Sequence, residues 1–219
     1  MNNLLLIAEI IVTFSCILFA RKAFGKEGLI AWVAMAAILA NVIQAKNANL
    51  LGLNAAIGHV MFSSGFLATD ILTECYGKEA AKKAVFVGLF SGIVYIICMV
   101  IALHYAPSPI DTASEHMNAL FGLNIRITSA SMFMYLVSNY IDVMLYSKIK
   151  ELTNGKYMWL RNNVSTIVCN CGENFIFAFL AFGGIYTAPQ IMGIAVASSL
   201  VEVVVGICDT PFLYAAKKL

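Results

Sequence analysis

Apolar stretches of membrane-spanning length occupy almost the whole chain, and only short connections separate them. An α-helix needs about 20 apolar residues to cross the hydrocarbon core of a bilayer. The composition agrees, because 61% of the residues are hydrophobic and 12% are charged, whereas soluble domains average about 45–50% and 25%. The candidate spans are 4–20, 28–45, 55–76, 84–105, 125–147, 161–182 and 189–214. The sequence therefore predicts an all-α integral membrane protein with about seven spans, in one transmembrane domain over residues 1–219.

The distribution of lysine and arginine predicts the orientation of these spans. With the N-terminus outside, 12 of the 14 basic residues fall in inner connections or at the C-terminus, and only Lys46 and Arg126 fall outside. Because cytoplasmic loops carry such an excess, we expect the C-terminus in the cytoplasm. The first stretch, 4–20, lacks the basic leader and the small-residue cleavage site of a signal peptide, so we expect a retained helix.

Acidic and amide side chains recur at helical spacing inside the apolar spans. Asn139 and Asp142 lie three residues apart, and Asn170 and Glu173 repeat that spacing. A carboxylate at the centre of a membrane helix costs about 2.5–3.5 kcal/mol, and such groups almost always face the bundle interior. We therefore expect five spans to surround an acid-rich polar site, although Asn139 and Asn170 can also simply hold helices together. The predicted substrate-binding residues are Asn41, Gln44, Phe66, Asp70, Glu74, Tyr135, Asn139, Asp142, Thr166, Asn170 and Glu173.

Several other polar residues have a purely structural interpretation as well. Glu74 lies near the inner interface and can pair with Lys78 one turn later, and Asp209 can pair in the same way near the inner end. Glu202 can be protonated and hydrogen-bonded to a neighbouring helix. His59 lies near the outer end of its span, so we expect an interfacial histidine.

The sequence contains no signature of nucleic-acid, metal or nucleotide chemistry. Cys169-x-Cys171 comes nearest to a metal or redox motif, but residues two apart on a helix point in different directions. The motifs H-E-x-x-H, G-x-S-x-G and G-x-x-x-x-G-K-[ST] are absent. We therefore predict a protein that is not an enzyme, has no metal or cofactor, and handles a small solute in the lipid bilayer. A membrane aspartyl enzyme built on Asp70 and Asp142, and an ion or proton channel, are the alternatives from other classes.

Four segments together resemble the queuosine precursor transporter family, also known as the vitamin uptake transporter family. They are FLATDILTECYGKEAAKK, IRITSASMFMYLVSNYIDVMLYSKIK, WLRNNVSTIVCNCGENFIFAFLAF and the terminal DTPFLYAAKKL. The resemblance covers roughly residues 28–219, so the helix 4–20 looks like an addition to a six-helix transporter core. It implies a multi-pass protein of the bacterial inner or plasma membrane that imports 7-deazaguanines, namely the 7-cyano or 7-aminomethyl precursors or queuine.

The chain departs from the family pattern at the repeated polar turns. Where the family usually has glutamine, this sequence has Asn139 and Asn170, and Glu173 replaces the usual aspartate. A guanine-like edge presents two neighbouring donors, which one carboxylate can accept. We expect Glu173 and Asp142 to accept from that edge, the two asparagines to orient it, and Asp70 to support the site or shuttle a proton. Ring faces suited to stacking on a flat base are Phe66, Tyr135 and Phe175.

The energy source and the partners of such a transporter stay open at this level. The family resemblance implies transport without a dedicated ATPase, and the acids suggest secondary, proton-coupled transport. The alternative is a substrate-binding subunit of a vitamin-type transporter that needs a separate ATPase module, because the chain has no P-loop. The small-residue face Ala36-x-x-x-Ala40 allows close helix packing within the bundle, against such a module, or in a homodimer.

Overall fold

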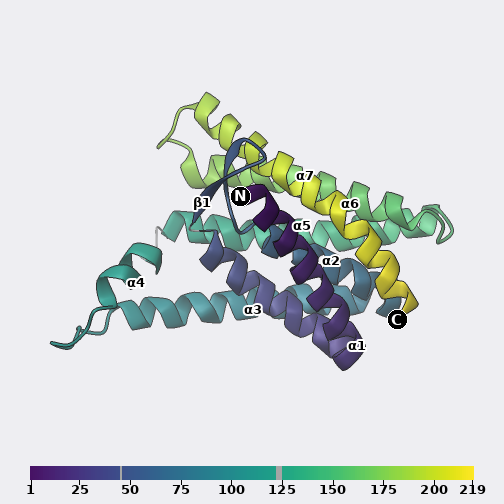
Figure 1. The fold of residues 1–219 in the computed structure, drawn as a ribbon, viewed down its shortest axis with the longest axis horizontal. Coiled ribbons are helices and arrows are strands. Elements are labelled where there is room, and N and C mark those ends of the chain that lie inside the picture. Colours follow the sequence, from purple (N-terminus) through teal and green to yellow (C-terminus); the bar gives the residue numbers. More distant parts are fainter. Residues whose placement is uncertain (45, 122–124) are drawn as a thin grey trace.

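Long helices and one short β-hairpin make up the fold of the computed structural model, which describes residues 1–44, 46–121 and 125–219 (Figure 1). Helices predominate because a chain in lipid must satisfy its backbone hydrogen bonds internally. The elements are α1 (Asn2–Ile43), β1 (Asn47–Leu50), β2 (Leu53–Ala56), α2 (His59–Tyr76), α3 (Lys78–Leu103), α4 (Ser114–Phe121), α5 (Ile125–Leu152), α6 (Met158–Phe182) and α7 (Ala188–Lys218).

Helix α2 is the centre of the bundle, and the other long helices form a ring around it. Going round the ring, α1 packs against α3, α3 against α5, α5 against α6, α6 against α7, and α7 against α1. Helix α2 contacts α1, α3, α5 and α7. It is accordingly buried over most of its length, including the polar residues Thr69, Asp70 and Thr73. Its polar sequence is therefore covered by protein and does not face lipid.

Helix α1 consists of two arms that reverse direction at Gly25. Gly25 has φ +60° and ψ −137°, a conformation outside the helical region that glycine adopts without a Cβ penalty. The amide of Asn2 donates to the Asn49 carbonyl at 3.1 Å, and Leu51 N–H donates to Asn3 Oδ1 at 3.0 Å. The start of the first arm thus lies beside the hairpin that follows the second arm. Figure 1 shows the reversal at the α1 label, which confirms two separate arms in place of one straight helix.

The helix boundaries differ from the predicted spans most clearly around the hairpin. The predicted spans end at residue 45 and resume at residue 55, which left residues 46–54 as a connection between helices. Instead, β1 and β2 pair in antiparallel register from Asn47↔Ala56 to Leu50↔Leu53, and α2 begins at His59. Leu51 and Gly52 have positive φ values of 55° and 84°, as a two-residue hairpin turn requires.

The remaining boundaries extend or subdivide the predicted segments. Helix α3 begins at Lys78, several residues before the expected start at 84, and α7 reaches Lys218. The predicted outer loop 106–124 contains the helix α4; its residues 122–124, like the predicted span end at residue 45, lie outside the described residues. Helix α7 begins with a capping box between Thr187 and Gln190 and has Pro189 in its first turn, as expected.

The basic segments assigned to the inner side gather at one end of the bundle. Lys150, Arg161 and Lys217 meet at Glu74 near the end of α2. At the turn between the arms of α1, a Cβ added to Gly25 would lie 3.8 Å from the hydroxyl of Tyr76. We call this the basic end, and the opposite end with β1 and β2 the hairpin end. The grouping agrees with the charge distribution, whereas the side of the membrane that each end faces stays a prediction.

Length and hydropathy identify four helices among the described residues as able to cross a membrane: α1, α3, α6 and α7. The total of seven spans therefore also stays a prediction. The first arm of α1 packs into the same bundle, since Phe14 and Ile17 are fully buried and Phe14 meets Phe212 of α7 edge-on at 5.3 Å.

The small-residue face Ala36-x-x-x-Ala40 packs inside the chain. Both alanines are buried. A Cβ added to Gly58 would lie 2.9 Å from the Ala40 carbonyl oxygen, and one added to Gly65 would lie 4.0 Å from the Ala36 Cβ. The face therefore brings α1 close to α2, and it is not free to dock an ATPase module or a second subunit.

Candidate functional site

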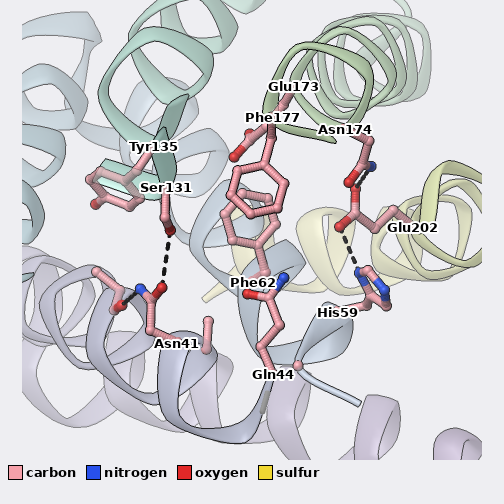
Figure 2. A pocket seen from close by; sticks show the side chains of 13 residues that line it. Asn41, Gln44, His59, Phe62, Ser131, Tyr135, Glu173, Asn174, Phe177 and Glu202 are labelled. Carbon is pink, nitrogen blue, oxygen red and sulfur yellow. Dashed lines mark hydrogen bonds and ion pairs between the residues drawn. The ribbon is translucent and has the colours of Figure 1, made fainter. Parts of the chain in front are cut away.

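A cavity at the hairpin end of the bundle has room for the centres of water-sized molecules over about 40 Å³ and opens to the outside through a mouth. Five helices, α1, α2, α5, α6 and α7, contribute side chains to its wall, several of which Figure 2 shows. We call it the large cavity. It is lined by Ala37, Ala40, Asn41, Gln44, Gly58, His59, Phe62, Ser131, Tyr135, Glu173, Asn174, Phe177 and Glu202.

One polar pair joins α1 to α5 across the large cavity. The Ser131 hydroxyl donates to Asn41 Oδ1 at 3.0 Å, and the Asn41 amide donates to the Ala37 carbonyl of its own helix at 2.8 Å. Gln44 lies one turn further along α1 and is exposed at the mouth. The structure thus places Asn41 and Gln44 on the wall of a common cavity.

A buried polar group on the opposite side joins α2, α6 and α7. His59 Nδ1 lies 2.8 Å from Glu202 Oε1, and the Asn174 amide donates to Glu202 Oε2 at 2.6 Å (Figure 2). His59 lies at the end of its helix, as expected, since it is the first residue of α2. It is only 4% exposed, because α6 and α7 cover its side chain. The predicted hydrogen bonding of Glu202 to a neighbouring helix is confirmed.

Unpaired polar atoms also face this part of the bundle. Among the described side chains, His59 Nε2, Tyr135 Oη and Glu173 Oε2 are buried without a hydrogen-bond partner. Each belongs to a residue on the cavity wall. Because buried polar atoms are nearly always paired, these three are groups that a polar ligand can satisfy.

Two aromatic rings lie between the polar groups in the view of Figure 2, namely Phe62 and Phe177. Phe62 belongs to α2 and Phe177 to α6. Of the aromatic residues predicted to stack on a ligand, only Tyr135 lines the cavity. Phe66 is fully buried behind Phe62, which it meets edge-on at 5.4 Å. Phe175 packs elsewhere, against a small cluster formed by Ala178, Ile191 and Ala195.

A smaller cavity of about 10 Å³ on the same measure adjoins the large one and shares Ala37, Phe62 and Tyr135 with it. Asn139 lines this smaller cavity and donates its amide to the Tyr135 carbonyl of its own helix at 2.9 Å. The predicted residue Asn139 therefore lies next to the large cavity, one turn of α5 closer to the basic end.

Other predicted site residues lie deeper in the bundle and line neither cavity. Asp70, Asp142, Thr166 and Asn170 are at most 1% exposed. Both amide atoms of Asn170 and the hydroxyl of Thr166 are without a partner among the described side chains. Asp70 acts electrostatically on Asp142 and on Asp209 of α7. We call Asp70, Asp142 and Asp209 the aspartate cluster.

Glu74 belongs to an ion-pair network at the basic end. Its carboxylate lies 2.8 Å from Arg161 Nη2, 3.1 Å from Lys150 Nζ and 2.6 Å from Lys217 Nζ. These partners come from α5, α6 and α7, so Glu74 has a structural role in pairing, as one interpretation of the sequence allowed, but across helices and not with Lys78. Asp209 likewise has no lysine partner among the described residues, because it is buried and accepts from the Asn162 amide at 2.5 Å.

The position of Arg161 differs from the sequence expectation as well. It was expected in a solvated inner connection, but its side chain is fully buried in the first turn of α6. Besides Glu74, its guanidinium donates to the carbonyls of Gly155 and Lys156 at 3.3 and 2.9 Å. The ring of Tyr146 lies 5.5 Å away. Arg161 therefore links α6 to Glu74 of α2 and to the turn that precedes α6.

Six polar or aromatic wall residues were not among the predicted site residues: His59, Phe62, Ser131, Asn174, Phe177 and Glu202. Ser131 lies on the polar face of its helix, which was the available signal. Asn174 directly follows Glu173, and the sequence analysis assigned the polar site at this point to Glu173 alone. No group of three or more His, Cys, Asp or Glu residues in the described part of the chain is arranged to hold a metal ion.

Comparison with known proteins identifies relatives over the entire chain. Residues 56–216 match the family described as "Putative vitamin uptake transporter". A Bacillus subtilis protein named "Probable queuosine precursor transporter" is 35% identical over 219 residues, which are 100% of this chain and 96% of that protein. A Haemophilus influenzae protein of the same name is 27% identical over 62% of this chain and 55% of its own length.

A further relative is the "Queuosine precursor transporter" of Escherichia coli. It is 26% identical over 61% of this chain and 58% of its own length. No solved structure matches the chain.

Proposed function

This chain belongs to the vitamin uptake transporter family, and we propose that it is a queuosine precursor transporter whose substrate site is the large cavity. Its family and its apolar helices make it a multi-pass protein of a bacterial membrane. The relatives are named as transporters, not enzymes, in line with the prediction that this chain catalyses no reaction. Beyond this, the proposal covers which deazaguanines bind in the cavity and how their transport is driven.

The observation that carries the proposal is the unpaired carboxylate oxygen of Glu173 on the cavity wall. A 7-deazaguanine presents a ring N–H and an amino group side by side, and a carboxylate is the acceptor that matches both. The hydroxyl of Tyr135 and Nε2 of His59 supply two further unpaired polar atoms. The walls also offer the rings of Phe62 and Phe177, which suit a flat heterocycle.

The predicted site residues divide into two groups by position. Glu173, Tyr135, Asn41 and Gln44 line the large cavity, and we assign them to substrate contact, with Asn139 supporting Tyr135 from the adjoining smaller cavity. Those that line neither cavity are Phe66, Asp70, Glu74, Asp142, Thr166 and Asn170. We assign no direct substrate contact to this second group. We therefore no longer propose that Asp142 accepts hydrogen bonds from the donor edge of the substrate.

The substrates we propose are 7-cyano-7-deazaguanine, 7-aminomethyl-7-deazaguanine and queuine. They share the donor edge that Glu173 accepts, and the aminomethyl base adds a cationic arm. Such an arm gains from a second acid nearby, and Glu202 lies on the same wall. We propose secondary transport because the chain has no P-loop of its own, and proton coupling because its buried carboxyl groups can carry protons.

The direct test is uptake of the three bases into cells that can neither synthesise the precursor nor import it. We expect the parent chain to restore queuosine in transfer RNA and Glu173→Gln to reduce uptake by at least tenfold, because an amide cannot accept from both donors. Glu79→Gln is the matched control, since Glu79 is an exposed acid far from the cavity. Equal uptake by the parent and Glu173→Gln would refute the assignment of Glu173.

Binding to the purified protein tests the substrate class separately. A ligand that binds only the folded state raises the unfolding temperature, so we expect a shift with the three deazaguanines and none with adenine, which lacks the guanine donor edge. A shift with none of the three deazaguanines would overturn the proposed function.

A further inference from the structure

We propose that the aspartate cluster is a proton-binding site, separate from the substrate cavity, that couples proton movement to transport. The proposal rests on the transport function above. It depends on Asp70 of α2, Asp142 of α5 and Asp209 of α7, which are each 0% exposed.

The cluster and the large cavity occupy different levels of the bundle. On α2, Phe62 lines the cavity and Asp70 follows eight residues later; on α7, Glu202 lines the cavity and Asp209 follows after seven. At 1.5 Å per residue these intervals correspond to about 10–12 Å along the helices. A substrate in the cavity therefore does not reach the cluster, although α2, α5 and α7 contribute residues to both.

The carboxyl oxygens of the cluster have few hydrogen-bond donors, namely the Ser165 hydroxyl acting on Asp142 and the Asn162 amide acting on Asp209. Both oxygens of Asp70, both oxygens of Asp142 and Oδ2 of Asp209 are buried without a partner of good geometry among the described side chains. The one short bond is from the Asn162 amide to Asp209 Oδ1, at 2.5 Å. Asn162 is fully buried too, and its own Oδ1 is unpaired. The site is thus lined by oxygen acceptors and short of hydrogens.

Protonation supplies the missing donors. A protonated carboxyl gains one O–H donor, which a neighbouring carboxylate or the Asn162 carbonyl oxygen can accept. Carboxyl groups that share a buried site cannot all be ionised, because like charges in a low dielectric repel strongly. The absence of a metal-like grouping among the described residues favours a proton over a metal cation as the ligand.

The charged and titratable neighbours leave the cluster without full compensation. Arg161 is the cation that acts on Asp70, but it is already paired with Glu74 at 2.8 Å. Tyr146 of α5 and Cys169 of α6 also face the cluster. Helices α1 and α3, which pack against α2 as well, contribute no titratable group that acts on these carboxyls among the described side chains. Negative charge in the cluster is therefore best neutralised by protons.

The position of the cluster explains how its protonation can affect transport. Asp70 lies one turn of α2 from Glu74, and Arg161 acts on both. When the cluster loses a proton, its negative charge attracts Arg161 away from Glu74. That exchange weakens the ion pairs that hold α2, α5, α6 and α7 together at the basic end. Proton release thus favours opening of the end opposite the substrate cavity.

The transport test uses proteoliposomes containing the full chain and a radiolabelled deazaguanine. With one proton per substrate, an inward gradient of one pH unit drives up to about tenfold accumulation. We expect this in the parent and its loss in Asp142→Asn and Asp209→Asn. Exchange of internal for external substrate, which needs no net proton movement, should continue in both variants. The exposed Glu79→Gln serves as the acid-to-amide control and should accumulate substrate like the parent.

Three outcomes would overturn the proposal: normal gradient-driven accumulation by both variants, a parent driven by a sodium gradient but not by protons, or a parent with no gradient-driven accumulation at all. Asp209→Asn keeps an acceptor for the Asn162 amide, so it is the variant that should fold best. Substrate-induced thermal shifts that persist in the variants show that the cavity is intact, which separates failure of coupling from failure of the proposed function.

Infrared spectroscopy tests the cluster without any substrate. We expect the purified parent at neutral pH to show the C=O band of protonated carboxyl groups, sensitive to exchange into D2O, and the band to shrink in both aspartate variants. If the parent shows no such band, or if neither substitution affects it, the cluster does not hold a proton and the proposal is wrong.

Discussion

Tyr135 lines both cavities, and its position depends on a glycine of another helix. A Cβ added to Gly88 of α3 would overlap the hydroxyl of Tyr135 and lie 3.0 Å from its Cζ. The ring is only 7% exposed, so it has little room to move aside. Gly88 therefore acts on the candidate substrate site from a helix that contributes nothing to the cavity wall.

We expect Gly88→Ala to weaken deazaguanine binding and to destabilise the fold by about 1–3 kcal/mol, the usual cost of overpacking. Thermal unfolding and ligand-induced shifts measure the two effects. Adding Tyr135→Phe removes the overlapping hydroxyl and should restore part of the stability. Gly92→Ala is the matched control, because its nearest neighbour is the flexible Met132 side chain. A Gly88→Ala protein as stable as the Gly92→Ala protein would contradict this account.

Glu74 illustrates how a single acid can hold four helices together. Its side chain is 2% exposed and contacts basic residues of three other helices. Removing one partner of a buried pair leaves the other charge uncompensated. The effect should be large here because Arg161 is 0% exposed.

We expect Glu74→Gln to lower stability by about 3 kcal/mol, the low end for a buried pair, because the carbonyls of Gly155 and Lys156 still accept from Arg161. Thermal unfolding in detergent measures this. Glu79→Gln, which removes a single exposed i,i+3 pair with Lys82, should change stability by less than about 1 kcal/mol. Similar effects of the two substitutions would show that the Glu74 network does not stabilise the basic end.

At the scale of elements, α1 depends on the conformation of one residue. Its two arms fold back on each other only because the chain reverses at Gly25, where φ is +60°. A second glycine follows at the turn: a Cβ on Gly28 would lie 2.5 Å from the Ala20 carbonyl oxygen. The reversal brings Asn2 and Asn3 back to the hairpin.

Gly25→Ala should therefore destabilise the protein by about 1–3 kcal/mol, the usual cost of a side chain in a glycine-only backbone region. The unfolding temperature measures this directly. Gly193→Ala provides the control: it lies inside α7 with no atom within 4 Å of an added Cβ, and alanine favours a helix. If both substitutions change the unfolding temperature equally, a side chain at residue 25 does not strain the turn.

At the scale of the whole molecule, the two ends of the bundle differ in chemistry. The hairpin end carries the large cavity with its His59 and Glu202 pair, and the basic end carries the Glu74 network. The aspartate cluster lies between them. With the predicted orientation, the cavity opens outward and the network closes the cytoplasmic side, which is the arrangement expected of an importer before substrate is released.

Cysteine labelling in intact cells tests this orientation. Asn49→Cys at the hairpin end should react with a membrane-impermeant maleimide, whereas Glu151→Cys at the basic end should react only after permeabilisation. Both positions are exposed, and the parent chain reports the background from its six native cysteines. The reverse labelling pattern would place the N-terminus in the cytoplasm and make the cavity face inward.

The sequence alone determined the features that depend on local composition and spacing. Apolar length predicts helices in lipid, because an unpaired backbone cannot be solvated there. Basic residues predict which connections share one end, and helical spacing places Asn41 and Gln44, or Asn139 and Asp142, on common faces. These features follow from each segment by itself. The family resemblance likewise follows from short sequence motifs.

Only the tertiary structure decided which polar residues meet. Glu74 and Arg161 are 87 residues apart and His59 and Glu202 are 143 apart, so no local pattern reveals their pairing. The packing order of the helices also separates Glu173, on the cavity wall, from Asp142, in the aspartate cluster, although both show the same amide-and-acid spacing. The physical reason is that spacing assigns a residue to a face of its own helix, whereas depth and neighbouring helices decide what that face contacts.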